Sequence, residues 1–166
     1  ERLNKVNLII CGAGALGSNL IDTITRQGYK TLTVIDKDRI EPQNIGTQVY
    51  GESEIGSLKA QTLKNRVFRH TGIEINAISK ELVNNNAKSL LTKAGLVVDV
   101  FDNSISRQLV QDICRVNNIN CIHAGLSSDY GEVIWDKNYK VPRDDVGDVC
   151  DYPLARNLIS IVVAVL

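Results

Sequence analysis

The stretch that decides the fold runs Val6-Asn7-Leu8-Ile9-Ile10-Cys11-Gly12-Ala13-Gly14-Ala15-Leu16-Gly17-Ser18. An apolar run, typical of a buried strand, breaks here into a glycine loop and then into helix-forming residues. The glycine spacing fits G-x-G-x-x-G, in which the backbone can approach a phosphate closely. The helix that follows would turn its unpaired N–H groups and the positive end of its dipole toward that phosphate. The stretch therefore predicts a nucleotide site at Gly12, Gly14, Ala15, Leu16 and Gly17, without saying which nucleotide binds.

Apolar runs alternate with helical patterns along almost the whole chain. The predicted strands are 6–11, 31–36, 74–80, 96–100, 121–124 and 132–135, and the predicted helices between them are 17–27, 58–70, 86–94 and 105–117. This order favours a Rossmann-like, doubly wound α/β fold whose mainly parallel sheet is covered on both faces. The loop 125–131 is too short for a crossover helix, so we expect an antiparallel pair of strands at one edge.

Length and composition are those of an ordinary globular domain. The 166 residues suffice for one domain, and 19 basic residues balance 19 acidic ones, so charge indicates neither nucleic acid nor a membrane as partner. The apolar run 158–166 is too short to span a bilayer, and we expect it to be a buried element cut at its end, in an excerpt of a longer chain. No two of the four cysteines form a C-x-x-C pair, which argues against zinc and favours a reducing cytoplasm.

Two long segments, 37–57 and 138–153, are predicted loops, and long loops in compact domains usually carry function. Asp36 ends the second predicted strand, where an acidic side chain accepts hydrogen bonds from the ribose hydroxyls of a bound nucleotide. The glycines and Asp36 alone fit two classes of protein about equally. One is an NAD-dependent oxidoreductase, and the other is a nucleotidyltransferase.

The residues that follow separate these two classes. They are, in order, Asp36-Lys37-Asp38, Asn44 with Gln48, Gly56-Ser57-Leu58-Lys59-Ala60, Asp102-Asn103 with Arg107, and His123-Ala124-Gly125. Together with the glycine loop, they resemble the ThiF/MoeB/HesA family, which includes the adenylation domains of ubiquitin-activating enzymes. The resemblance covers nearly the whole chain, whereas an oxidoreductase would leave Asn44, Lys59 and Asp102 unexplained.

The resemblance implies an enzyme that binds ATP and magnesium, joins AMP to a carboxylate and releases pyrophosphate. The carboxylate is usually the C-terminal glycine of a ubiquitin-like or sulfur-carrier protein, although some relatives act on peptides or on tRNA. Residues 1–166 would then form a single ATP-binding adenylation domain, and members of the family are commonly homodimers. A carboxylate is already an anion at neutral pH, so this reaction needs positioning and positive charge rather than a strong base.

The family motifs imply roles for individual residues. Lys59 would contact the phosphates and Asp102 would hold magnesium, so these two carry the catalysis. Asp36 would hold the ribose, while Asp38 and Asn44 would order the site around the sugar and the phosphates.

Gln48 is a weaker candidate in the same motif. The family usually carries an arginine that binds the leaving phosphates just before this glutamine, and here Thr47 stands in that place. Arg39, Arg107 or a residue of a second subunit could replace it. Otherwise the protein would bind nucleotide without turnover and serve as a docking subunit.

Each candidate also has a plainer interpretation. Lys59 alone would be a solvated helix lysine, and Asp102 would belong to a helix cap. Arg107 fits an ion pair as well as a structural role near the nucleotide, and His123 fits a satisfied core histidine better than a catalyst.

Cys150 lies in the second long loop, where some relatives carry a nucleophilic cysteine that forms a thioester or a persulfide. Asp148 and Asp151 flank it and no cation is near in the sequence, so the local charge does not favour its thiolate.

Overall fold

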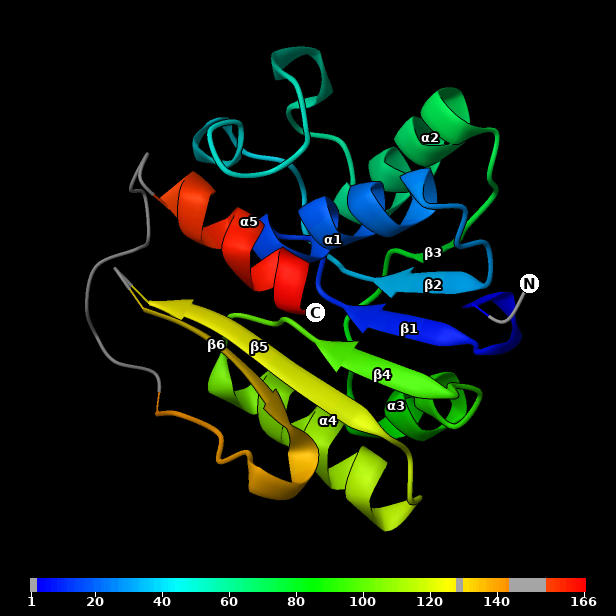
Figure 1. Ribbon diagram of the computed structural model, residues 1–166, viewed down its shortest axis with the longest axis vertical. Helices are drawn as coiled ribbons and strands as arrows, with labels where there is room; N and C mark the ends of the chain where they lie inside the picture. The colour runs from blue at the N-terminus through cyan, green and yellow to red at the C-terminus, as the bar shows by residue number, and fades with distance from the viewer. Residues whose placement is uncertain (1–2, 128–129, 144–154) are drawn as a thin grey trace.

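The structure is a computed structural model that describes residues 3–127, 130–143 and 155–166. These residues form one sheet with the strand order β3-β2-β1-β4-β5-β6 (Figure 1). The strands are β1 (Leu8–Cys11), β2 (Leu32–Ile35), β3 (Asn76–Ile78), β4 (Leu96–Asp99), β5 (Cys121–Ser127) and β6 (Tyr130–Trp135). All neighbouring pairs are parallel except β5 and β6, which are antiparallel. The predicted Rossmann-like sheet with an antiparallel edge is confirmed.

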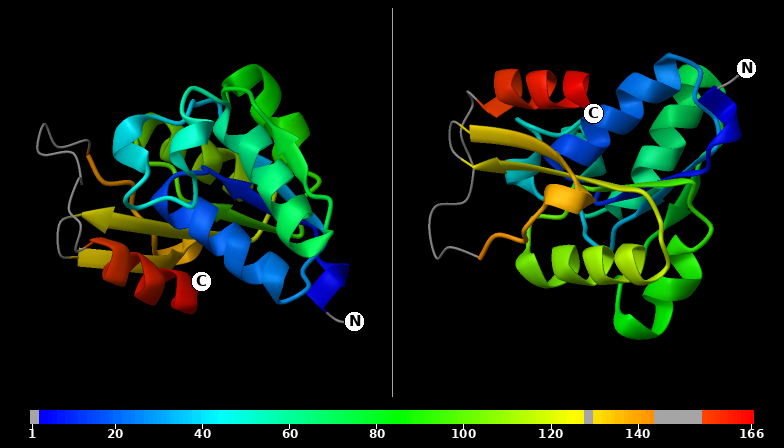
Figure 2. Two further views of the ribbon diagram at one scale, coloured as in Figure 1. Left: turned by 90° about the horizontal axis from the view of Figure 1, so that it is seen from above. Right: turned by 60° about the horizontal axis from the view of Figure 1, so that its bottom comes forward.

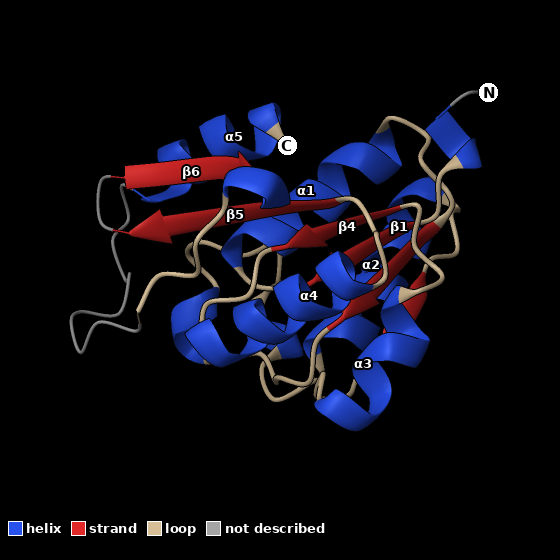
Figure 3. Ribbon diagram, turned by 90° about the horizontal axis from the view of Figure 1, so that it is seen from below, coloured by secondary structure: helices blue, strands red, loops and turns tan. Residues whose placement is uncertain are grey.

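Helices cover both faces of the sheet (Figure 2). One face carries α1 (Ala15–Arg26), α2 (Lys59–Thr71) and α5 (Ala155–Val165), and the other carries α3 (Asn84–Leu91) and α4 (Ser104–Val116). Figure 3 shows the second face from below. The side chains of β1 alternate between the two cores, since Ile10 packs under α1 and α2 while Ile9 and Cys11 pack under α3 and α4. A strand buried on both faces explains why this run is apolar throughout.

The predicted strands and helices are all present, with shifted bounds. Among the described residues, the structure adds four short 3-10 helices, at Leu3–Lys5, Pro42–Asn44, Glu52–Glu54 and Asp136–Asn138. The predicted loop 37–57 holds the second and third of these, so it is a folded segment. Backbone hydrogen bonds hold this segment together, for example the one that Gly56 N donates to Ile40 O at 2.8 Å.

The apolar run at the chain end forms most of α5, which packs against α1 and β6. Ile159 and Val162 are buried at 2% and 4% exposure, whereas Ile161 and Val165 are 62% and 66% exposed. The expectation of a buried element is therefore correct for one helix face and wrong for the other. In the described residues, no helix combines the length and apolar character needed to cross a membrane.

Candidate functional site

The glycine loop lies between β1 and α1, at the carboxyl edge of the sheet. Gly12 has a φ of +111°, and a Cβ there would lie 3.0 Å from Val100 O, at the end of the neighbouring strand. A Cβ on Gly17 would lie 2.0 Å from Gly12 O, so α1 packs on the loop too closely for any side chain. By contrast, a Cβ on Gly14 would meet nothing within 4 Å. The loop therefore packs tightly against the protein at Gly12 and Gly17, whereas the space beside Gly14 is open.

The first turn of α1 keeps its polar groups available. Its N-cap residue is Gly14, which makes no side-chain capping bond. The N–H groups of a first helical turn lack partners inside the helix, so an uncapped helix beside open space is suited to bind an anion. Ala15 and Leu16 belong to this turn, with the Leu16 side chain buried in the core. The geometry fits phosphate recognition by backbone rather than by side chains.

Asp36 follows β2 directly and holds the glycine loop in place. Its Oδ2 accepts a bond from Ala13 N at 2.6 Å, and its Oδ1 accepts one from Asp38 N at 2.7 Å. Burial raises the pKa of the Asp36 carboxyl above its usual value, while the two N–H bonds and the charge of Lys59 offset part of this rise. Each carboxylate oxygen has a second lone pair, so the group can still accept a bond from a ligand hydroxyl.

Lys59 begins α2 beside Asp38. Lys59 N donates to Asp38 O at 2.9 Å, and Lys59 Nζ lies 4.0 Å from Asp38 Oδ2, with side-chain exposures of 11% and 52%. This distance is at the limit of an ion pair, so the ammonium keeps donors for a ligand. The interpretation of Lys59 as a freely solvated helix lysine is wrong, because its side chain is largely buried.

Tyr50 is a part of the site that no sequence motif singles out. Its buried hydroxyl donates to Ala13 O at 2.8 Å and also lies 3.4 Å from Lys59 O. Burial and the charges of Asp36 and Glu54 raise the pKa of Tyr50, so the phenol stays protonated and donates. Tyr50 therefore ties the glycine loop to the start of α2.

The segment around Asn44 and Gln48 docks on the first half of α1. Asn44 Oδ1 accepts from Glu41 N at 2.9 Å, so this side chain closes the turn at Pro42–Asn44. Asn19 Nδ2 donates to Thr47 O at 2.9 Å, which fixes the segment against α1. Gln48 is 8% exposed, and among the described residues its Oε1 is the buried side-chain oxygen that lacks a hydrogen-bond donor. A buried acceptor without a partner costs about 1–3 kcal/mol, which a ligand donor would remove.

Asp102 lies exposed between β4 and α4. The capping role falls on its neighbour, since Asn103 Oδ1 accepts from Ser106 N at 2.9 Å. The glycine loop follows β1 and Asp102 follows β4, which pairs parallel with β1. The Asp102 carboxylate therefore lies at the same edge of the sheet as the glycine loop. In the described chain, no cluster of three or more His, Cys, Asp or Glu could hold a metal ion. Magnesium suits one carboxylate oxygen supplemented by phosphates and water, and Asp102 fits that donor set.

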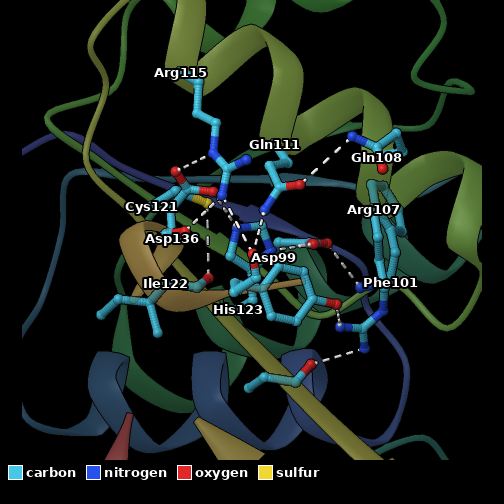
Figure 4. Close-up of polar contacts among 12 residues, drawn as sticks. Asp99, Phe101, Arg107, Gln108, Gln111, Arg115, Cys121, Ile122, His123 and Asp136 are labelled. Carbon is cyan, nitrogen blue, oxygen red and sulfur yellow. Dashed lines mark hydrogen bonds and ion pairs between the residues drawn. The ribbon is translucent and has the colours of Figure 1, made fainter. Parts of the chain in front are cut away.

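His123 and Arg107 take part in a buried polar network (Figure 4). His123 Nδ1 lies 2.8 Å from Asp99 Oδ2 and Nε2 lies 3.2 Å from Asp136 Oδ1, and the ring stacks on Tyr139 at 3.9 Å. The interpretation of His123 as a satisfied core histidine is confirmed. Arg107 makes no ion pair within the described residues, and its guanidinium donates to Tyr139 OH at 2.7 Å and to Ala124 O at 2.9 Å. Of the two interpretations of Arg107, the ion pair is not found among the described residues, and a structural role in this network is what the geometry shows.

The cysteines divide into two groups. Cys11, Cys114 and Cys121 are free and buried, and burial, with the charge of Asp99, raises the pKa of the Cys11 thiol. Such thiols are inert core groups. Cys150 lies outside the described residues, so its role stays a prediction.

Similarity to known proteins agrees with this arrangement. The sequence model of the ThiF family matches residues 1–142. The sulfur carrier protein adenylyltransferase of Thermus thermophilus is 32% identical over 114 residues, which cover 68% of this chain and 42% of that protein. Adenylyltransferase and sulfurtransferase MOCS3 of Caenorhabditis briggsae is 31% identical over 121 residues, covering 72% and 30%. The chain spans less than half the length of these relatives.

Solved structures share the fold. Escherichia coli MccB with MccA-N7isoASN gives a TM-score of 0.83 at 18% identity, over 98% of this chain and 55% of that one. The E. coli tRNA N6-threonylcarbamoyladenosine dehydratase TcdA in complex with AMP gives 0.69 at 19% identity, over 74% and 51%. With the family match over residues 1–142 and relatives above 30% identity, the chain belongs to the ThiF family.

Proposed function

We propose that residues 1–166 form an adenylation domain that joins AMP from ATP to a carboxylate and releases pyrophosphate. One observation carries the proposal. The open glycine loop, the Asp36 carboxylate and the largely buried Lys59 ammonium lie together at the carboxyl edge of the sheet, and Asp102 follows the adjacent strand. Open parallel sheets bind their ligands at this edge.

Three parts of this site can each bind a different part of the nucleotide. The N–H groups of the first turn of α1 receive phosphate oxygens at the open face of Gly14. Asp36, held by Ala13 N and Asp38 N, accepts from the ribose hydroxyls. The free Oε1 of Gln48 accepts a further bond from a donor of the nucleotide.

Lys59 then stabilises the charge that moves onto the outer phosphates as the substrate carboxylate attacks the inner one. Its ammonium is mostly withdrawn from water, which strengthens its field on a bound anion. When bound at Asp102, magnesium would neutralise part of the same charge. No general base is needed, because the attacking carboxylate is already ionised.

The substrate that supplies this carboxylate is proposed by analogy. The relatives include a sulfur carrier protein adenylyltransferase and the SAMP-activating enzyme E1 of Haloferax volcanii, which supports the C-terminal glycine of a ubiquitin-like or sulfur-carrier protein. The TcdA structures support a tRNA substrate as the other option. A homodimer and a cytoplasmic location belong to the same proposal, and the free buried thiols Cys11, Cys114 and Cys121 fit a reducing compartment.

Pyrophosphate exchange tests the reaction. The chain is incubated with ATP, magnesium, labelled pyrophosphate and a candidate carrier protein, and incorporation of label into ATP is measured. We expect Lys59→Ala and Asp102→Ala each to lower exchange by about a hundredfold or more, since each removes a charge from the transition state. Lys64→Ala is the control, because Lys64 lies on the same helix and pairs with Glu74 at the surface. Exchange that survives both test substitutions contradicts the proposal.

Thr47 favours a second candidate function. The family motif supplies an arginine at this position, and this chain does not. A domain without that charge could bind nucleotide and serve as a docking subunit. Calorimetric titration with ATP that shows binding, combined with no pyrophosphate exchange for any carrier tested, would select this function. Binding of NAD instead of ATP would select an oxidoreductase.

A further inference from the structure

Arg156 brings a guanidinium from the far end of the chain to the segment that carries Asn44 and Gln48. It lies in the first turn of α5, and its Nη1 donates to Gly46 O at 3.1 Å, across 110 residues of sequence. The contact is anchored at both ends, because α5 packs on α1 and the segment after Gly46 is tied to α1 through Asn19 and Thr47 O. The guanidinium thus lies beside the segment that borders the first half of α1.

Two other arginines near this edge make their contacts elsewhere. Arg107 is 7% exposed and donates to Tyr139 OH and Ala124 O. Arg39 Nη1 donates to Gly56 O at 2.6 Å, at the start of α2 rather than beside α1. Arg107 is thus buried and held by these contacts, and Arg39, which is exposed with one bond to a carbonyl, contacts a different segment from the one that carries Thr47.

Arg156 keeps most of its donors. A guanidinium has five N–H groups, and the side chain is exposed, with one bond to a carbonyl and no carboxylate partner within the described residues. A guanidinium without an anion among the described residues, beside the segment that docks on α1, is suited to pair with a phosphate. A second observation marks the same segment as incomplete, since the buried Oε1 of Gln48 has no donor there.

We propose that Arg156 binds the outer phosphates of ATP and supplies the positive charge that Thr47 does not. This inference rests on the proposed function, because it assigns a ligand group within the same nucleotide site. Arg156 would act as a substrate-binding residue that favours ATP over AMP, since AMP lacks the phosphates that it holds. It also gives α5 a part in the site.

Nucleotide affinity measured by calorimetry on the full chain tests this role, without reliance on turnover. We expect Arg156→Ala to weaken ATP binding by about tenfold to a hundredfold and to leave AMP binding unchanged, because a hydrogen-bonded charge is lost from the outer phosphates alone. Arg156→Lys should lie between the two, since an ammonium keeps the charge and loses the paired donors. Arg69→Ala is the control, because Arg69 is exposed in the last turn of α2.

A rescue variant separates phosphate binding from a structural role. Adding Thr47→Arg to Arg156→Ala returns a guanidinium to the neighbouring position, and ATP affinity should recover. Unchanged ATP affinity in Arg156→Ala, or equal losses for ATP and AMP without rescue, would overturn the role of Arg156 while the proposed function stands. A wild-type chain that binds neither nucleotide would instead overturn the proposed function and this inference together.

Discussion

At the scale of single residues, Tyr50 connects stability to nucleotide binding. Its buried hydroxyl donates to Ala13 O, and the Ala13 N–H in turn donates to Asp36. Tyr50→Phe leaves this carbonyl without its donor inside the protein, so we expect the free energy of unfolding to fall by about 1–2 kcal/mol. ATP affinity should fall with it, because the loop that faces the phosphates is less well held. Urea unfolding and calorimetric titration measure the two effects.

Tyr29→Phe is the matched control for this prediction. The Tyr29 hydroxyl also donates to a backbone carbonyl, that of Val6 at 2.7 Å, in an exposed position away from the glycine loop. Water can replace the lost donor there, so both stability and ATP affinity should change little. If the two phenylalanine variants behave alike, Tyr50 has no special role.

The residues of the site differ in how far the sequence could reveal them. Asp36 could be predicted because it ends the strand that follows the glycine loop, and Lys59 because it stands in a Gly-x-x-Lys-Ala motif that resembles that of the family. Tyr50 could not, because its contact with Ala13 depends on how the segment 37–57 folds back over the sheet. Arg156 could not either, since its neighbour Gly46 is 110 residues away. Contacts of this kind follow from the packing of helices, which no local pattern encodes.

At the scale of elements, the tight contact between α1 and the glycine loop predicts that Gly17 and Gly14 respond differently to substitution. A methyl group on Gly17 would lie 2.0 Å from Gly12 O, whereas one on Gly14 would meet nothing within 4 Å. We expect Gly17→Ala to lower the free energy of unfolding by about 1–3 kcal/mol, since the helix must shift. Gly14→Ala should preserve stability and weaken ATP binding, because its methyl group occupies the open side of the loop. Thermal unfolding with and without ATP separates the two, and a stable Gly17→Ala variant would contradict the observed packing.

The elements themselves follow from short-range patterns. β1 and β4 are runs of apolar residues bounded by turns, which is the pattern of a strand buried on both faces. The antiparallel edge follows from the shortness of the loop between β5 and β6. The burial of α5 was harder to predict, because its run of apolar residues, unlike the amphipathic α4, does not show which face meets the core. Ile159 and Ile161 look equivalent in the sequence and differ only in what packs beside them.

At the scale of the whole molecule, the two faces of the sheet carry different groups of residues. The face with α1, α2 and α5 carries the glycine loop, Lys59 and Arg156. Toward the other face, a polar network joins β4, β5 and α4: His123 lies between Asp99 and Asp136, and Arg115 donates to Asp136 (Figure 4). Since Asp99 ends the strand that precedes Asp102, this network also holds the strand end from which Asp102 follows. Rigid support beneath a site keeps its groups in place while the ligands exchange.

Asp136 is the member of this network that should make stability depend on pH. Although burial acts to raise its pKa, bonds from Arg115, Gln111 and His123 outweigh that effect and lower the pKa of Asp136 below its usual value of 3.8. A carboxyl whose folded pKa is lowered contributes stability that is complete above its unfolded pKa and is lost as pH falls through the folded value. The contribution should therefore be constant near neutral pH and be lost progressively as pH falls below about 4.

Asp136→Asn tests this dependence. At neutral pH the variant should unfold about 1–3 kcal/mol more easily, because His123 and Arg115 lose a charged acceptor, although the exposure of Arg115 keeps the loss toward the lower end. The difference from wild type should shrink as pH falls below about 4, since the wild-type carboxyl then takes up a proton. Asp22→Asn, which removes the exposed pair with Arg26, should change stability little at any pH. Urea unfolding across this range of pH measures all three chains, and a difference for Asp136→Asn that stays constant down to acid pH would show that its charge does not support the fold.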